Sequence, residues 1–84
     1  MIRDLSVRIA LQRPEIVGGV VSFVDAGGAW AALDDAERPR FSIRMRRDVR
    51  AGWRVAWDQR RFRIAAALDQ DDARLDLICE EEIT

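Results

Sequence analysis

Side chains that could move protons at neutral pH are scarce in this sequence. It contains no histidine, so the most common general base is missing. Adjacent carboxylates occur only at Asp34-Asp35, Asp71-Asp72 and Glu80–Glu82. Each group falls in a stretch expected to be a turn or a tail, where water keeps a carboxylate near its ordinary protonation range. We therefore expect no catalytic residues and predict that the chain is not an enzyme.

Metal and cofactor sites have no support either. Cys79 is the single cysteine, which excludes an internal disulfide and, without histidine, leaves too few soft ligands for zinc. Its alternation with Leu75 and Leu77 predicts a small buried hydrophobe. Gly27-Gly28 lacks the lysine and the spacing of a phosphate-binding loop. We predict no cofactor and no metal.

Arginine supplies all of the positive charge. Fourteen arginines oppose fifteen carboxylates in 84 residues, giving a net charge of −1 and no lysine. One interpretation is a genome rich in G and C, which favours arginine codons. The other is that arginine's planar fork suits ion pairs held in protein interfaces. The two interpretations are compatible.

Nucleic-acid binding is one function that the arginines could serve. Many of them lie in the middle third, between aromatic residues: Arg44, Arg46, Arg47, Arg50, Arg54, Arg60, Arg61 and Arg63. Small barrels that bind single strands combine such a basic groove with exposed aromatic rings. Against this, the middle-third aromatics alternate in phase with aliphatic residues, which predicts that they face the core. The sequence pI near 5.4 also lacks the basic excess that drives phosphate binding.

Assembly is the third function class. An arginine-rich outer face on one edge and carboxylates on another would suit head-to-tail contacts between copies, which close into rings when the rotation allows. The alternative is an ordinary solvated surface of mixed charge. The residues alone leave both open.

Alternation with period two predicts a mainly β chain with little or no helix. About six short strands fit a small six-stranded antiparallel barrel or sandwich in a single domain over residues 1–84. The expected strand segments are Leu5–Arg13, Val20–Val24 with its continuation Ala29–Leu33, Phe41–Arg47, Trp53–Trp57, Arg61–Ala67 and Leu75–Cys79. No window approaches the roughly 20 apolar residues that span a bilayer, so no membrane contact is predicted.

Turn residues separate these segments. Pro14 is expected to end the first strand, and Gly18-Gly19 to form a turn. Asp25–Gly28 is either a turn or a bulge that bends one long strand. Gly52 is expected where φ is positive. Asp58–Arg60 should close a hairpin, and Asp69–Arg74 should form a polar turn.

The inward positions of these strands give a predicted core. Trp53, Val55 and Trp57 should face Phe62, Ile64 and Ala66 across the hairpin. The full predicted barrel core is Val7, Ile9, Leu11, Trp30, Phe41, Ile43, Val55, Trp57, Phe62, Ile64 and Leu77.

The order of motifs resembles that of a known family. The stretches that carry the resemblance are Leu5-x-x-Arg8-Ile9-x-Leu11-Gln12-Arg13-Pro14, Ala29-Trp30-Ala31-Ala32-Leu33, Phe41-x-Ile43-Arg44, Val49-x-x-Gly52-x-Arg54-Val55-x-Trp57, Arg61-Phe62-x-Ile64 and Leu75-x-Leu77-x-Cys79-Glu80. In this order and spacing they are similar to the head–tail joining (head-closure, or stopper) proteins of tailed bacteriophages. The compact length and the arginine bias are similar to versions from prophages and gene transfer agents.

The resemblance implies a structural role in a phage-like particle. Such proteins stack as a ring, in twelve copies, in the neck between portal or adaptor proteins and the tail terminator protein. There they help retain packaged double-stranded DNA and dock the tail, after assembly in the bacterial cytoplasm. The alternative function remains a small β-barrel module that binds single-stranded nucleic acid.

The resemblance also assigns roles to charged residues. The family's loop between the second and third strands faces the central channel, which here gives Asp34, Asp35, Glu37, Arg38 and Arg40. This loop is shorter than is common in the family, so the sequence does not say whether it closes the channel. The expected contacts with neighbouring subunits are Arg44, Arg46, Arg54, Arg63, Glu80, Glu81 and Glu82. The N-terminal segment or Glu80–Glu82 would meet the adjacent rings.

Overall fold

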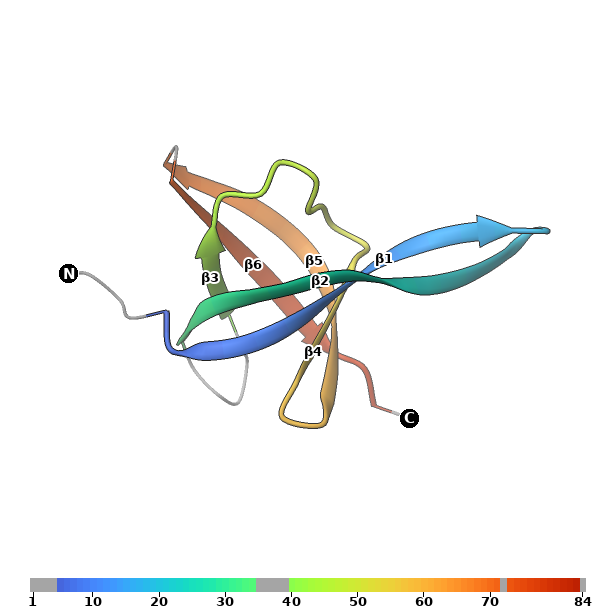
Figure 1. Ribbon diagram of the computed structural model, residues 1–84, viewed down its shortest axis with the longest axis horizontal. Coiled ribbons are helices and arrows are strands. Elements are labelled where there is room, and N and C mark those ends of the chain that lie inside the picture. Colours follow the sequence, from blue (N-terminus) through green and yellow to red (C-terminus); the bar gives the residue numbers. More distant parts are fainter. Residues whose placement is uncertain (1–4, 35–39, 72, 84) are drawn as a thin grey trace.

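The protein is a closed antiparallel β-barrel. The computed structural model describes residues 5–34, 40–71 and 73–83, and in these ranges the chain forms strands and no helix. Around the barrel the strands follow the order β1-β2-β3-β6-β5-β4 (Figure 1). Their bounds are β1 Val7–Val17, β2 Val20–Asp34, β3 Arg40–Arg44, β4 Arg54–Trp57, β5 Arg60–Asp71 and β6 Arg74–Glu81. The predicted six-stranded antiparallel fold is confirmed, as a barrel rather than a sandwich.

The barrel closes between β1 and β4. Only three residue pairs join these strands, from Ala10 opposite Ala56 to Gln12 opposite Arg54. Beyond Gln12, β1 is paired with β2 alone, so the two strands leave the barrel as a projecting hairpin. We call residues 13–24 the arm; it extends to the right in Figure 1.

Pro14 does not end the first strand, contrary to the sequence prediction. It lies within β1, opposite Phe23 of β2. On the arm β1 has a neighbour on one side only, and such an edge strand tolerates a residue that lacks a backbone N–H. The strand instead ends at the predicted Gly18-Gly19 turn, where both residues have positive φ (59° and 78°) and suit a tight two-residue hairpin.

A β-bulge bends β2 where the arm leaves the barrel. Between the pairs Ala10–Gly28 and Gln12–Asp25, β2 carries one residue more than β1. Gly27 has a φ of +93°, and its N–H donates to the Asp25 carboxylate at 3.0 Å. Of the two alternatives that the sequence left open for Asp25–Gly28, the bulge is therefore confirmed.

The barrel interior holds most of the predicted core. The eight largest side chains that are less than 2% exposed are Phe41, Phe62, Ile9, Leu11, Ile43, Ile64, Leu77 and Val55. The Phe41 ring meets the rings of Trp57 and Phe62 edge to face, with centroids 5.8 and 5.7 Å apart. Trp57 and Val7 are partly buried and pack against this cluster.

Trp30 is not part of the core, contrary to the sequence prediction. It is 54% exposed, while Ala31 is fully buried. The register explains this difference. Ile9 lies opposite Ala29 and Arg8 opposite Trp30, so β2 turns Ala29 and Ala31 inward and Trp30 outward together with Arg8.

Other strand boundaries and one inward position also differ from the prediction. β1 begins at Val7 rather than Leu5, and β3 ends at Arg44 rather than Arg47. β5 continues to Asp71, so most of the predicted polar turn after Leu68 is strand. A register shift between Ile64 and Ala66 moves the inward position to Ala67, which packs against the core. Gly52 has the expected positive φ, and Asp58 and Gln59 form the expected hairpin turn.

The aromatic cluster gives a direct test of the core. Phe41→Ala should lower the free energy of unfolding by about 3–5 kcal/mol, because it removes a fully buried ring that contacts two others. Trp30→Ala is the matched control and should cost much less, since its ring is half exposed. Urea unfolding followed by circular dichroism measures both. Equal losses would contradict this description of the core.

Candidate functional site

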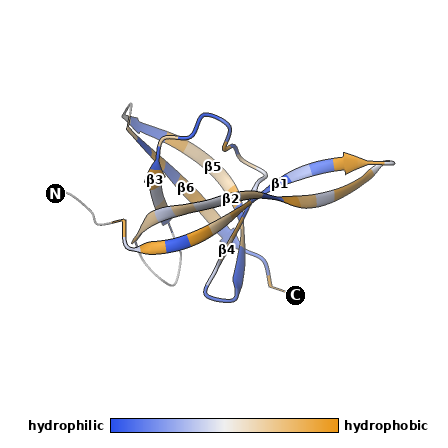
Figure 2. Cartoon of the chain, viewed as in Figure 1, coloured by the Kyte–Doolittle hydropathy of each residue, from blue (hydrophilic) through white to orange (hydrophobic). Residues whose placement is uncertain are grey.

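The end of the arm is apolar on both faces. Ile16, Val17, Val20 and Val21 are 72, 61, 67 and 57% exposed. We call these four residues the arm tip; the strand end at the tip is coloured hydrophobic in Figure 2. Alternation along a strand cannot turn all four side chains to one side, so no single folding of the arm could bury them. The tip is therefore an exposed apolar surface of the kind that marks interaction sites.

A second apolar surface surrounds Trp30 on the outside of the barrel. We call it the Trp30 groove. It is lined by Leu5, Arg8, Gly28, Ala29, Trp30, Arg44 and Arg46. The Arg8 guanidinium lies 5.5 Å from the centre of the Trp30 ring, in cation–π contact. A Cβ atom at Gly28 would come within 2.7 Å of this guanidinium, so the glycine makes room for Arg8 to lie against β2.

Arg54 joins the base of the arm to the barrel. Its guanidinium lies 3.8 Å from the centre of the Phe23 ring and 2.8 Å from the Glu82 carboxylate. Phe23 belongs to the arm, whereas Arg54 and Glu82 belong to the barrel side of the molecule. The contact fixes the direction in which the arm leaves.

Two more pairs continue from Arg54 and Glu82 along the strands. Arg60 contacts Glu81 at 2.8 Å, and Arg63 contacts Glu80 at 2.9 Å. We call these three pairs the ion-pair ladder. The hydrogen bonds from Arg60 lower the pKa of Glu81 below its ordinary value, and those to Glu81 raise the pKa of Arg60. Charges predicted to meet a neighbouring subunit thus have partners within the chain.

Arg46 also has partners within the chain, whereas Arg44 differs. Arg46 pairs with Asp48 at 2.9 Å and donates to the Ala26 carbonyl at the bulge at 3.2 Å. Its hydrogen bonds lower the pKa of Asp48. Arg44 is exposed beside Trp30, and among the described residues it forms no ion pair.

The predicted channel-facing loop is described only at its ends. Asp35, Glu37 and Arg38 lie outside the described residues. Asp34 ends β2 and pairs in register with Arg40, the first residue of β3.

Arg40 belongs to a polar cluster on the outer face of β3 and β6. Its guanidinium contacts the Asp76 carboxylate at 2.8 Å, and the other carboxylate oxygen accepts a hydrogen bond from the Ser42 hydroxyl. Asp76 is only 7% exposed, so both partners compensate the burial of its charge. Sequence reasoning placed Asp76 in a strand but assigned it no partner.

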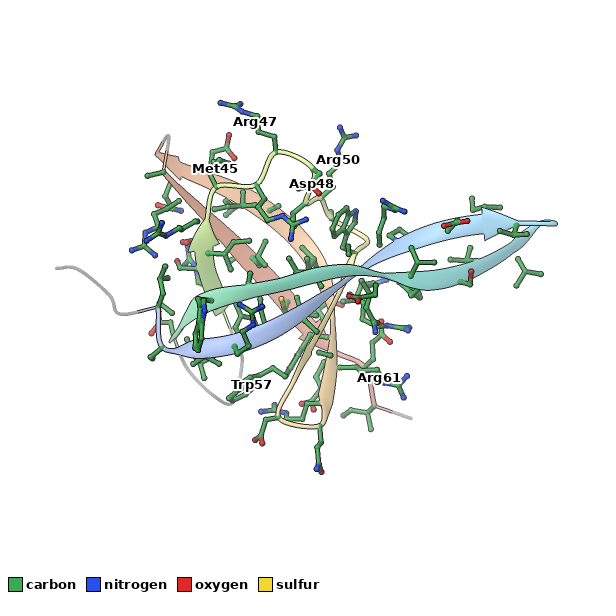
Figure 3. All side chains as sticks on the ribbon, viewed as in Figure 1. Met45, Arg47, Asp48, Arg50, Trp57 and Arg61 are labelled. Carbon is green, nitrogen blue, oxygen red and sulfur yellow. The ribbon has the colours of Figure 1, made fainter. Side chains whose placement is uncertain are left out.

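The arginines of the middle third do not converge on one groove. Arg47 and Arg50 point away from the barrel on the loop after β3, while Arg61 lies on the opposite side of the molecule (Figure 3). Phe41, Phe62 and Trp53 are buried, as the phase of the alternation predicted. The exposed ring near arginines is Trp30, which the sequence prediction had placed in the core.

The remaining chemistry is sparse in the described parts of the chain. Burial raises the pKa of Cys79 to about 12, and the thiol packs against the core as predicted. Within residues 5–34, 40–71 and 73–83 no three potential metal ligands gather at one place. No helix there is long and apolar enough to cross a membrane.

Sequence reasoning missed the arm tip and the Trp30 groove. A signal for the first was present, because apolar pairs flank Gly18-Gly19 on both sides and cannot all face one core. The groove depends on the register that sets Arg8 opposite Trp30, and one sequence does not fix that register.

The described residues thus form a small closed barrel with two exposed apolar surfaces. Residues 22–82 match the family model of the phage head completion protein. The chain belongs to this family, which confirms the predicted kinship with phage head-closure proteins. No curated protein and no solved structure matched the chain. The family is typically non-enzymatic, and membership indicates a phage head–tail structural role for a virion-associated protein that interacts with other virion components.

The buried carboxylate of the polar cluster gives a test of stability. Asp76→Ala should lower the free energy of unfolding by about 1–3 kcal/mol, because it leaves the Ser42 hydroxyl and the Arg40 guanidinium without their acceptor. Asp69→Ala, an exposed carboxylate on β5, is the control and should change little. Chemical denaturation measures both. A neutral Asp76→Ala would show that the cluster does not stabilise the barrel.

The ion-pair ladder gives a test in acid. The pKa of Glu81 is lowered in the folded state, so its pair stabilises the protein above the unfolded-state pKa and is lost as the pH falls through the folded-state value. We expect Glu81→Gln to lose less thermal stability than wild type between about pH 7 and about pH 3. The control is Glu15→Gln, because the Glu15 carboxylate lies 4.0 Å from the Arg13 guanidinium and outside the ion-pair ladder. This variant should lose as much thermal stability on acidification as the wild type. Identical losses in all three proteins would contradict a role for the ladder.

Proposed function

We propose that this chain is a connector protein that forms a ring in the neck of a tailed phage-like particle. The ring would hold twelve copies, the number that the family resemblance implies, between portal or adaptor proteins and the tail terminator protein. It would help retain packaged DNA and provide a surface on which the tail docks. The proposal is the same whether the particle is that of a phage or of a gene transfer agent.

The observation that carries the proposal is the family match over residues 22–82 on a barrel with two exposed apolar surfaces. A protein that acts alone in water gains nothing from leaving the arm tip uncovered. A protein that acts between other subunits can bury it on assembly. The chain is also near neutral overall, which suits a channel wall past which DNA slides without sticking.

The loop between Asp34 and Arg40 is proposed to face the channel. Its charges are mixed in the sequence: Asp34, Asp35, Glu37, Arg38 and Arg40. Of the charges proposed to contact neighbouring subunits, Arg44 has no ion-pair partner among the described residues. Arg54, Arg63 and Glu80–Glu82 would have to exchange or share their present partners in the ladder.

Imaging of the particle's neck tests the proposal. We expect a ring of this chain between portal and tail, and we expect particles that lack the gene to lose DNA or fail to join tails. Complementation with the wild-type gene is the control. Gene-deficient particles that keep their DNA and carry tails would overturn the proposed function.

A second candidate function is supported by one observation. Trp30 is exposed between Arg8 and Arg44, which is the combination of stacking ring and cations found in single-strand binding sites. This function would require tight binding of a single-stranded oligonucleotide at physiological salt, lost in Trp30→Ala. Fluorescence anisotropy of a labelled oligonucleotide measures this binding, and the absence of binding at physiological salt would exclude this candidate function.

A further inference from the structure

We propose that the arm tip of one copy packs into the Trp30 groove of the next copy in the ring. The inference rests on the proposed function and names the contact by which the ring would be built. Both surfaces belong to the same chain, and each exposes apolar side chains that its own fold leaves uncovered.

The arm tip cannot reach the groove of its own molecule. Val20 and Trp30 are ten positions apart on one continuous strand, which separates them by roughly 30 Å at the ordinary rise of a β-strand. The contact of Arg54 with Phe23, together with its ion pair to Glu82, joins the base of the arm to the barrel on the β4 side. Only another molecule can bring a tip to this groove.

The charges next to the two surfaces are complementary. Arg8 and Arg44 line the groove, and neither forms an ion pair within the described residues. Glu15 lies just behind the tip, and its carboxylate is 4.0 Å from its nearest guanidinium, that of Arg13. A tip seated on Trp30 would bring the Glu15 carboxylate toward two arginines, so the contact could form ion pairs in addition to burying apolar side chains.

The ladder charges make poorer contacts between copies. Arg54, Arg60 and Arg63 already pair with carboxylates of β6 and the residue after it, at 2.8 to 2.9 Å. An interface that used them would first have to break these pairs. In the groove Arg46 keeps its partner Asp48, whereas Arg8 and Arg44 have no ion pair to break within the described residues.

The proposed contact joins two different surfaces, so it repeats head to tail and can close into a ring. Four tip side chains cover far less than the ~800 Å² that each partner buries in a standard stable interface. A single contact is therefore weak, and isolated copies stay monomeric. In a closed ring every copy is held by two such contacts and by the neighbouring rings, and linked contacts reinforce one another.

Cysteine cross-linking in assembled particles tests the contact. In a Cys79→Ser background, Val20→Cys places a thiol on the tip and Leu5→Cys places one on the groove. Oxidation of particles that carry both cysteines should give a series of disulfide-linked dimers, trimers and larger oligomers on a non-reducing gel. The matched control carries Val20→Cys with Leu68→Cys in place of Leu5→Cys. Leu68 is an exposed leucine on β5, so this protein should give no series of cross-linked oligomers.

Three results would overturn the inference and leave the proposed function intact. The first is a ring of this chain in the neck that gives no cross-linked oligomers. The second is a dimer through Val20→Cys alone as the only product. The third is a cross-link from Leu5→Cys in the groove to a different neck protein. Absence of any ring of this chain in the neck would instead overturn the proposed function itself. A charge exchange supplies independent support. Arg44→Glu should reduce the yield of cross-linked oligomers, and Glu15→Arg in the same chain should restore that yield.

Discussion

The structure depends on how few residues close the barrel. β4 has four residues and meets β1 at three pairs, whereas β1 and β2 have eleven and fifteen residues. The longer strands have no barrel neighbours for their remaining length, so they continue together as the arm. The bulge before Gly28 turns β2 at this point, and Arg54 fixes the direction by contacting both Phe23 and Glu82. Barrel closure and the projecting arm are thus two results of one mismatch in strand length.

The fold was largely predictable because alternation with period two is a strong signal. Phe41-Ser42-Ile43 and Arg61-Phe62-Arg63-Ile64 showed which side chains face inward, and the structure buries Phe41, Ile43, Phe62 and Ile64. Strand ends were less predictable, since they depend on neighbours. Pro14 ends a strand only if its N–H is needed, and on the arm it is not.

The surfaces used in the proposals were not predictable from one sequence. Trp30 was expected inside because of its size, but the inward phase of β2 is set by its register with β1. The positions of Ala29 and Ala31 fit an interior already filled by phenylalanine rings. Likewise, the alternating charges indicated outward faces, but only the structure pairs Arg54, Arg60 and Arg63 with three successive glutamates.

The open edges of the arm have a consequence for the unassembled protein. A hairpin with apolar, β-branched residues at its end and no neighbouring strands is a template for aggregation. On β1 this hazard is countered by Pro14, which cannot donate to an added strand, and by the charges of Arg13 and Glu15 beside it. On β2 the run from Val20 to Val24 carries no charge. Of the two open edges of the arm, the β1 edge is therefore protected against an added strand, whereas the β2 edge has neither a proline nor a charge between Val20 and Val24.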